Sequence, residues 1–359
     1  MEQVCDPGSC IQGVAKDRWG MTRNRRAKLV KVGQVEVESE EVPVPGENEY
    51  LIKITAVGVC GSDIHYFEHG KIGRFVVEAP LVLGHEAAGV IVGAGPGANM
   101  ARIGHRVAVE PGVPCGRCMQ CRSGGYNLCP DVRFLATPPI DGAFADYIVH
   151  SGDFVYDVSD DISNEQAALC EPLSVGIWAN RRAGVRCGDR VLVTGCGPIG
   201  LMAAQVAREF GAHVILSDVV PSRRDAARSL GFDNLHDAMS SPVDESGIVA
   251  DVLVECTGAA DVALRAIRTL TPGGRAVLVG MAPEEEQVLP VAVIQSKEIM
   301  LTGVFRYANT YPLAIELFHQ GRIQVDPIVG ARFSLEDVTA ALKISRIDPS
   351  CIKPMVLPG

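Results

Sequence analysis

The sequence lacks the features that mark several classes of protein. No run of 18 or more uncharged apolar residues occurs in its 359 residues, so we expect no membrane-spanning helix. Basic residues near the N-terminus are not followed by an apolar segment of signal-peptide length, which favours a cytoplasmic location. The formal net charge is -10, which argues against a sequence-independent grip on nucleic acid phosphates. Internal repeats and low-complexity tracts are missing as well.

The residues that are present suit a two-domain α/β protein. Hydrophobic residues make up 47% of the chain and charged residues 21%, the balance of a soluble globular protein. Up to about residue 150, short runs rich in Val, Ile and Gly alternate with turn signals, which predicts a β-rich module. From about residue 188, strand and helix patterns alternate, which predicts βαβ units in a doubly wound parallel sheet. We therefore expect a polar extension, a β-rich module, a nucleotide-binding module and a segment returning to the first module, over residues 1–26, 27–172, 173–310 and 311–359.

A glycine-rich turn marks the expected coenzyme site. Gly195, Gly197 and Gly200 form a GxGxxG string with Pro198 and Ile199, between an apolar strand pattern and a helix pattern. Such glycines permit a tight turn and a close approach of backbone to pyrophosphate, and the helix N-terminus attracts the phosphates. The alternative is a plain strand-to-helix turn, which the strand and helix context disfavours.

The coenzyme is expected to be NAD. Asp218 closes the next strand pattern, where a carboxylate accepts hydrogen bonds from the adenosine ribose and repels a 2′-phosphate. Arg223 and Arg224 follow closely and leave NADP open, because a guanidinium can also bind a phosphate. They are otherwise a solvated helix face.

Four of the 12 cysteines fall within fifteen residues, at positions 115, 118, 121 and 129. Because four thiolates complete a tetrahedral zinc shell and leave no open position, Cys115, Cys118, Cys121 and Cys129 predict a structural zinc site. An iron–sulfur cluster is the alternative for this spacing. Apart from Cys60, the remaining cysteines are scattered and receive no role.

A second group predicts a catalytic zinc. Cys60, His85, Glu86 and Glu171 offer one thiolate, one imidazole and two carboxylates, and an incomplete protein shell leaves a place for water or substrate. Neighbouring strand residues point to opposite faces, so His85 and Glu86 reach one metal only at a strand end or bend, which Gly84 would allow. The third protein ligand is therefore either Glu86 or Glu171, and the other lies behind it.

The order of GHEAAG, the four-cysteine loop and GxGxxG resembles the zinc-containing medium-chain dehydrogenases. Longer strings, such as CGSDIHYFEHGKIG, CEPLSVGIWA and GVFRYANTYPLAI, are similar to the sorbitol dehydrogenase branch, and the similarity runs from about residue 27 to the end. This resemblance implies a GroES-like catalytic domain, a Rossmann coenzyme domain, an active site between them and a homotetramer. Unlike some animal members, this chain has all four cysteines of the structural site.

The resemblance also assigns roles to residues. It implies that Cys60, His85 and Glu86 bind the catalytic zinc, that Glu171 contacts zinc-bound water or substrate, and that Tyr66, Arg306 and Tyr307 line the substrate pocket. The matching coenzyme contacts are Ile199, Asp218, Arg223, Val279, Gly280, Met281, Val304, Phe305 and Arg306.

The expected activity is NAD-dependent interconversion of a polyol and its ketose, with two zinc ions per chain. Zinc lowers the pKa of the substrate hydroxyl, hydride passes to the nicotinamide, and Ser62, Glu171 and bound water are candidates for removing the proton, with His65 a weaker one. Threonine, a butanediol or a sugar acid are alternative substrates. A non-catalytic NAD-binding subunit or sensor is the alternative from another class, and the filled ligand positions disfavour it.

Overall fold

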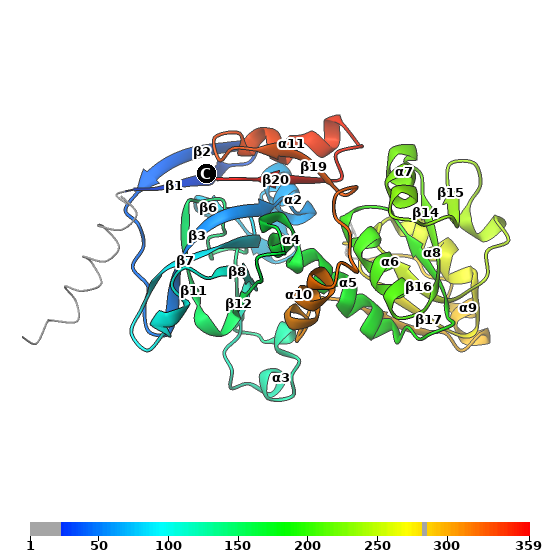
Figure 1. Ribbon diagram of the computed structural model, residues 1–359. Helices are drawn as coiled ribbons and strands as arrows, with labels where there is room; N and C mark the ends of the chain where they lie inside the picture. The colour runs from blue at the N-terminus through cyan, green and yellow to red at the C-terminus, as the bar shows by residue number, and fades with distance from the viewer. Residues whose placement is uncertain (1–22, 282–285) are drawn as a thin grey trace, which may run out of the picture.

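The computed structural model describes residues 23–281 and 286–359, which form two lobes side by side (Figure 1). The expected N-terminal extension falls outside these residues up to position 22, and its last residues belong to strand β1, which begins at Asn24. Within the described ranges, no helix has both the length and the apolar composition needed to cross a bilayer.

The left-hand lobe in Figure 1 is β-rich, as predicted. Its main sheet has the order β12-β8-β7-β3-β20-β19, and β11 also pairs with β3. The strands of this sheet are β3 Glu49–Gly58, β7 Glu86–Ala94, β8 Arg106–Val109, β11 Tyr147–Ser151, β12 Val155–Asp157, β19 Val329–Phe333 and β20 Lys353–Val356. Smaller sheets beside it contain β1 Asn24–Lys31, β2 Gln34–Glu40, β6 Leu81–Val82, β4 Lys71–Ile72, β5 Phe75–Val76, β9 Gly112–Val113 and β10 Arg133–Phe134.

The right-hand lobe is the predicted doubly wound module. Its six strands are all parallel, in the order β15-β14-β13-β16-β17-β18. Their bounds are β13 Arg190–Thr194, β14 His213–Asp218, β15 Leu235–Asp237, β16 Ala250–Glu255, β17 Leu270–Leu278 and β18 Met300–Gly303. Both faces of this sheet are covered: Val191 and Val193 of β13 belong to one apolar cluster, and Leu192 between them belongs to another. This near-continuous apolar pattern is typical of a strand buried on both sides.

Helices connect and cover the sheets. Their bounds are α2 Gly61–His69, α3 Met119–Arg122, α4 Asn164–Ala168, α5 Cys170–Ala183, α6 Pro198–Glu209, α7 Pro221–Ser229, α8 Ala260–Arg268, α9 Val291–Ser296, α10 Tyr311–His319 and α11 Val338–Ile347. Short 3-10 turns are η1 Met100–Arg102, η2 Tyr126–Leu128, η3 Gly152–Phe154 and η4 Val243–Glu245. Helix α2, nine residues long, lies within the β-rich half.

Helix α5 joins the two lobes. It crosses α6 so closely that a Cβ on Gly176 would lie 2.9 Å from the backbone nitrogen of Ala203. The apolar cluster around it also includes Ala56 of the left-hand sheet and Met355 of β20. Helix α5 runs without a break through positions 172 and 173, so no change of element marks the expected domain boundary there. That boundary stays a prediction.

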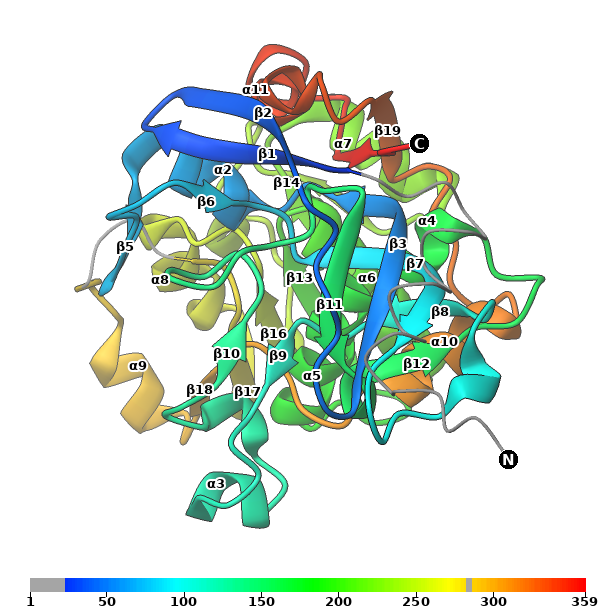
Figure 2. The same ribbon diagram turned by 90° about the vertical axis from the view of Figure 1, so that its left-hand side faces the viewer.

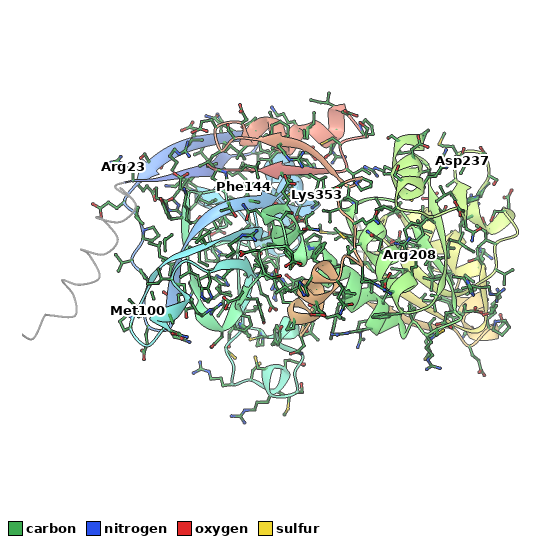
Figure 3. The ribbon with its side chains drawn as sticks, viewed as in Figure 1. Arg23, Met100, Phe144, Arg208, Asp237 and Lys353 are labelled. Carbon is green, nitrogen blue, oxygen red and sulfur yellow. The ribbon has the colours of Figure 1, made fainter. Side chains whose placement is uncertain are left out.

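The C-terminal segment returns to the left-hand lobe. Strand β20 pairs with β3, and β19 pairs with β20 at the edge of that sheet (Figure 1). Figure 2 shows the C-terminus beside β19. One consequence is that residues near the C-terminus lie beside residues from the first third of the chain. Figure 3 labels one of them, Lys353 of β20, which is buried within the left-hand lobe.

Candidate active site

The first site residues lie at the start of two elements. Cys60 precedes helix α2, and its backbone N–H donates to Oδ2 of Asp63, at a distance of 2.9 Å. The other carboxylate oxygen of Asp63 accepts from the N–H of Gly84, also at 2.9 Å. Asp63 is fully buried and lies 3.6 Å from Nδ1 of His85. This one carboxylate therefore ties the segments that carry Cys60 and His85 together.

Gly84 supplies the bend that adjacent ligands need. Its φ is +86°, a conformation that favours glycine, and a Cβ there would lie 2.7 Å from the ring of Phe144. His85 follows the bend and Glu86 begins β7, so the two side chains escape the strict alternation of a strand. Ligand atoms of Cys60, His85 and Glu86 all lie within 4.8 Å of one another.

A buried lysine, which the sequence analysis missed, faces this group. Nζ of Lys353 lies 2.6 Å and 2.9 Å from the two oxygens of Glu86 and donates to the carbonyl of Val59. Lys353 is 2% exposed and Glu86 is fully buried. Glu86 also lies over Gly58, where a Cβ would approach its carboxylate to 2.0 Å. Glu86 is thus held between a cation and a glycine.

The second candidate carboxylate has a different partner. Oε1 of Glu171, in the first turn of α5, accepts from the hydroxyl of Tyr307 at 2.9 Å. Burial raises the pKa of Glu171 to about 7. Glu171 is not one of the residues whose ligand atoms cluster with those of Cys60 and His85. The structure therefore groups Glu86 with Cys60 and His85, whereas Glu171 is hydrogen-bonded to Tyr307.

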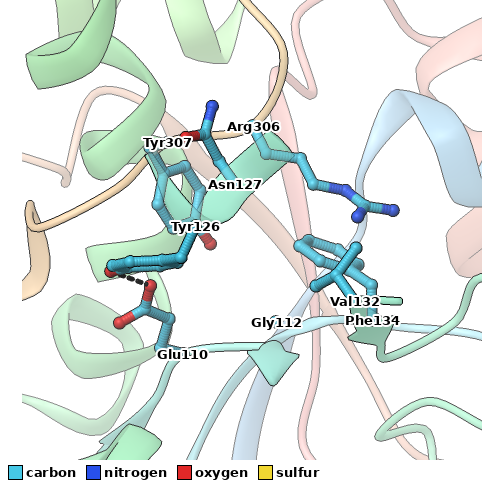
Figure 4. Close-up of a pocket in the computed structure, with 8 residues that line it drawn as sticks. All are labelled: Glu110, Gly112, Tyr126, Asn127, Val132, Phe134, Arg306 and Tyr307. Atoms are coloured by element: carbon cyan, nitrogen blue, oxygen red, sulfur yellow. Dashed lines mark hydrogen bonds between the residues drawn. The ribbon is translucent and has the colours of Figure 1, made fainter. Parts of the chain in front are cut away.

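Two of the expected substrate residues, Arg306 and Tyr307, line a pocket together with the aromatic ring of Phe134, which was not expected there. The guanidinium of Arg306 lies 3.9 Å from the ring centre of Phe134, and the same ring packs beside His85. Burial lowers the pKa of Arg306 to about 10 and raises that of Tyr66 to about 12. The pocket around Arg306 is shown in Figure 4.

Candidates for the proton path lie along α2. Ser62 is half-buried in the first turn of this helix. The His65 ring contacts His69, and burial lowers its pKa. Their role in proton transfer stays a prediction.

The glycine-rich turn has the geometry that its sequence predicts. Gly195 has a φ of +91°, and a Cβ on Gly200 would lie 1.8 Å from the carbonyl oxygen of Gly195. Helix α6 begins directly after Gly197, with Pro198 at its first position. The backbone N–H groups at this helix start are suited to bind phosphate.

Asp218 ends β14 and is fixed toward the glycine turn. Its carboxylate accepts from the N–H of Cys196 at 2.6 Å and from the N–H of Val220 at 2.7 Å. Arg224 pairs with Asp237 at 3.0 Å and donates to the Asp218 carbonyl. Arg223 differs, since its Nε is buried without a hydrogen-bond partner among the described residues.

Further expected coenzyme residues follow the next two strands. Val279, Gly280 and Met281 come after β17, and a Cβ on Gly280 would lie 2.1 Å from the nitrogen of Gly258. Val304, Phe305 and Arg306 come after β18. All of these segments leave the carboxyl ends of parallel strands, where such sheets bind ligands. A further buried carboxylate, Glu255, ends β16 and accepts from the N–H of Thr257 at 2.7 Å.

The four clustered cysteines form a compact group in a loop that projects from the left-hand lobe, at the bottom of Figure 1. The sulfurs of Cys118 and Cys121 are 3.4 Å apart, and those of Cys115 and Cys121 are 4.0 Å apart. Zinc–sulfur bonds of about 2.3 Å place tetrahedral sulfurs about 3.8 Å apart. The four thiols therefore fit a single zinc ion, whereas a multi-iron cluster would hold them farther apart.

A buried carboxyl group behind the pocket predicts a pH effect on stability. Burial raises the pKa of Glu110 from 4.5 to about 7, although hydroxyls of Tyr126 and Tyr156 donate to it. Between these values the folded protein holds a proton that the unfolded chain has lost, so stability falls as the pH rises. We expect Glu110→Gln to gain about 3 kcal/mol relative to the unsubstituted protein between pH 4.5 and 8.

Denaturant unfolding of both proteins at several pH values measures this difference. Titrations elsewhere in the chain contribute equally to both proteins and cancel. A difference between the two that does not change with pH would show that Glu110 keeps its ordinary pKa.

Two family models match separate parts of the chain, and known relatives cover most of it. Residues 46–160 match the alcohol dehydrogenase GroES-like domain, and residues 198–320 match the zinc-binding dehydrogenase family. Sorbitol dehydrogenase of Bacillus subtilis is 43% identical over 336 residues, which cover 90% of this chain and 95% of that protein. L-idonate 5-dehydrogenase of Vitis vinifera is 37% identical, over 92% of this chain and 94% of that protein. A solved alcohol dehydrogenase of Escherichia coli in complex with NADH has a TM-score of 0.88 and 27% identity, over 94% of this chain and 99% of that one.

Proposed function

The chain belongs to the zinc-containing medium-chain dehydrogenases, in the sorbitol dehydrogenase branch, and on that premise we propose how its residues convert a polyol to a ketose with NAD. The observation that carries the proposal is the convergence of Cys60, His85 and Glu86 beside a pocket that contains Arg306. These residues fit a zinc ion, since one thiolate, one imidazole and one carboxylate leave a coordination place open. Zinc bound there supplies Lewis acidity that favours loss of the alcohol proton.

The chain itself positions the substrate and moves the proton. We assign Glu86 as the third ligand, because its oxygens cluster with Cys60 and His85. Glu171 then receives or relays the proton, since its buried carboxylate accepts a hydrogen bond from the Tyr307 hydroxyl and lies in the substrate region. Ser62 is the preferred candidate on α2 for passing the proton to solvent, and His65 is the weaker one.

The polyol hydroxyls that do not react need partners of their own. Arg306 is half-buried and offers several N–H donors, and Tyr66 offers a hydroxyl. A substrate that leaves such groups unpaired loses binding free energy in the transition state. This arrangement favours a polyol over a simple alcohol.

The coenzyme is NAD, held by the glycine turn and by Asp218. A carboxylate next to the ribose repels a 2′-phosphate, and Arg224 is already paired with Asp237. We propose further coenzyme contacts from Ile199, Arg223, the Val279–Met281 segment and the Val304–Arg306 segment.

We also propose how the chain assembles and where it is located. Strand β18 forms one edge of the six-stranded sheet, and Met300 on it is 63% exposed, so a second copy can pair there and start a homotetramer. A cytoplasmic location fits a site that depends on reduced thiols.

A substrate panel tests the activity. Initial rates of NADH formation are compared for sorbitol, xylitol, arabinitol, ribitol, galactitol, threonine, L-idonate and ethanol, each with NAD and with NADP. We expect the highest kcat/KM for a polyol with NAD, and a value at least about tenfold lower for ethanol, which leaves the Arg306 donors unpaired.

Other outcomes of the panel would change the assignment. A sugar acid is the next candidate, because the Vitis vinifera relative acts on L-idonate by its name. Faster turnover of L-idonate or threonine than of any polyol would overturn the polyol proposal. Efficient ethanol turnover without polyol activity would overturn the role given to Arg306.

A further inference from the structure

The four-cysteine loop, residues 115–129, contacts the segment that carries the expected substrate residues Arg306 and Tyr307. Nδ2 of Asn127 donates to the carbonyl of Phe305 at 2.8 Å. The N–H of Asn309 donates to the hydroxyl of Tyr126 at 2.8 Å, and its side chain donates to the carbonyl of Gly124 at 2.9 Å. Three hydrogen bonds thus join this loop to residues 305–309, which we call the pocket segment.

The pocket segment has a backbone that needs such support. Arg306 has a φ of +53° and Asn309 a φ of +56°. Asparagine adopts this left-handed conformation more readily than arginine does, and both conformations are uncommon outside glycine. The contact of Asn127 precedes Arg306 by one residue, and the contact of Tyr126 follows it by three. The loop therefore holds both ends of the strained part of the segment.

Tyr126 is itself fixed from below. Its hydroxyl donates to Glu110 at 2.7 Å (Figure 4). The same hydroxyl accepts from the N–H of Asn309, so its position is set on two sides. Asn127 is 5% exposed. Its side-chain oxygen has no hydrogen-bond partner among the described residues, and its side-chain nitrogen donates to the Phe305 carbonyl. Both side chains line the same pocket as Arg306 and Tyr307.

We propose that Tyr126 and Asn127 are positioning residues for substrate, which hold Arg306 and Tyr307 of the pocket segment at the polyol. This inference rests on the proposed function and deepens it. It gives the cysteine loop a second role besides stability. Because Cys129 lies two residues after Asn127, a metal bound by the four thiolates would also hold Tyr126 and Asn127 in place against the pocket segment.

Two matched tyrosine variants test the proposal in the zinc-loaded protein. Tyr126 and Tyr156 each donate a hydroxyl to Glu110, but only the Tyr126 hydroxyl also accepts from Asn309. We expect Tyr126→Phe to raise KM for the best polyol on the order of tenfold, with kcat changed much less. The ratio of polyol to 2-butanol turnover should fall by a similar factor. Tyr156→Phe removes the same kind of bond to Glu110 but leaves the contact with Asn309 intact, so both quantities should change less than about twofold.

Asn127 provides a second pair. Asn127→Ala removes the donor to Phe305 and is expected to raise the polyol KM to a similar extent, and Asn127→Asp, which keeps the side-chain size but replaces the donor with an acceptor, should raise it at least as much. A polyol KM in Asn127→Asp close to that of the unsubstituted protein would contradict a role through the hydrogen bond.

A readout that does not depend on turnover separates this inference from the proposed activity. Hydrogen–deuterium exchange in peptides that cover residues 304–311 should become faster in Tyr126→Phe and stay unchanged in Tyr156→Phe, with the zinc content of both unchanged. Unchanged exchange in Tyr126→Phe would overturn the positioning role, even if the protein turns over no polyol. Faster exchange with an unchanged polyol KM would overturn the assignment of this segment to substrate binding.

Discussion

Replacing Cys60 with serine is expected to lower kcat/KM for the polyol by about a thousandfold or more, because a Lewis acid contributes several kcal/mol to such a reaction. Serine is a poor zinc ligand, and the remaining His85 and Glu86 offer too few donors to hold the ion. The coenzyme turn lies in the other lobe, so the Kd for NADH should change less than about twofold. Steady-state rates, NADH fluorescence titration and metal analysis measure the three quantities.

The control for this variant is the same substitution at an exposed cysteine. Cys187 is exposed and belongs to neither cysteine group, so Cys187→Ser should keep full activity and both zinc ions. Metal analysis should give about two zinc ions per chain for this control and about one for Cys60→Ser. Full turnover in Cys60→Ser would refute the proposed mechanism.

Replacing Lys353 with methionine is expected to lower the free energy of unfolding by about 3–5 kcal/mol, because it leaves the buried Glu86 carboxylate without its cation. The loss should be smaller in zinc-loaded than in metal-free protein if Glu86 is the third ligand, since the ion then neutralises the same carboxylate. Denaturant unfolding of the zinc-loaded and the metal-free protein measures the effect. The midpoints are compared where the dependence of the unfolding free energy on denaturant concentration is the same.

Two further variants separate the ion pair from lost packing. Lys343 is exposed with its ammonium over the Phe67 ring, so Lys343→Met should cost less than about 1 kcal/mol. In metal-free protein, the double variant Glu86→Gln with Lys353→Met should be more stable than Lys353→Met alone, because no charge then remains buried. If the double variant is the less stable of the two, the buried charge is not the cause.

The parts of the molecule that the sequence predicted well depend on local pattern. The glycine turn, its flanking strand and helix, and the four-cysteine loop each arise from residues within about twenty positions of one another. The bend at Gly84 was also expected, because two adjacent ligands could not otherwise face one metal.

What the sequence analysis missed depends on contacts between distant segments. Lys353 reads as an ordinary charged residue near the chain end, and only the pairing of β20 with β3 places it beside Glu86. The contact of Asn127 with Phe305 spans 178 residues and leaves no local signal. Helix α2 could have been recognised from Asp63, which accepts from the Cys60 N–H as an acidic residue in a helix's first turn does. Cysteine is an unusual residue at a helix start, so the signal was weak.

The distance along the chain between Glu86 and its lysine bears on how the protein is made. The two residues are 267 positions apart, and the whole six-stranded sheet lies between them. At typical rates of translation, a ribosome needs roughly 15–50 s to travel that far. During this time the left-hand sheet lacks β20, and Glu86 has no Lys353 to pair with. The nascent first lobe is therefore an incomplete sheet with an open edge, which a chaperone is suited to shield until the last strand arrives.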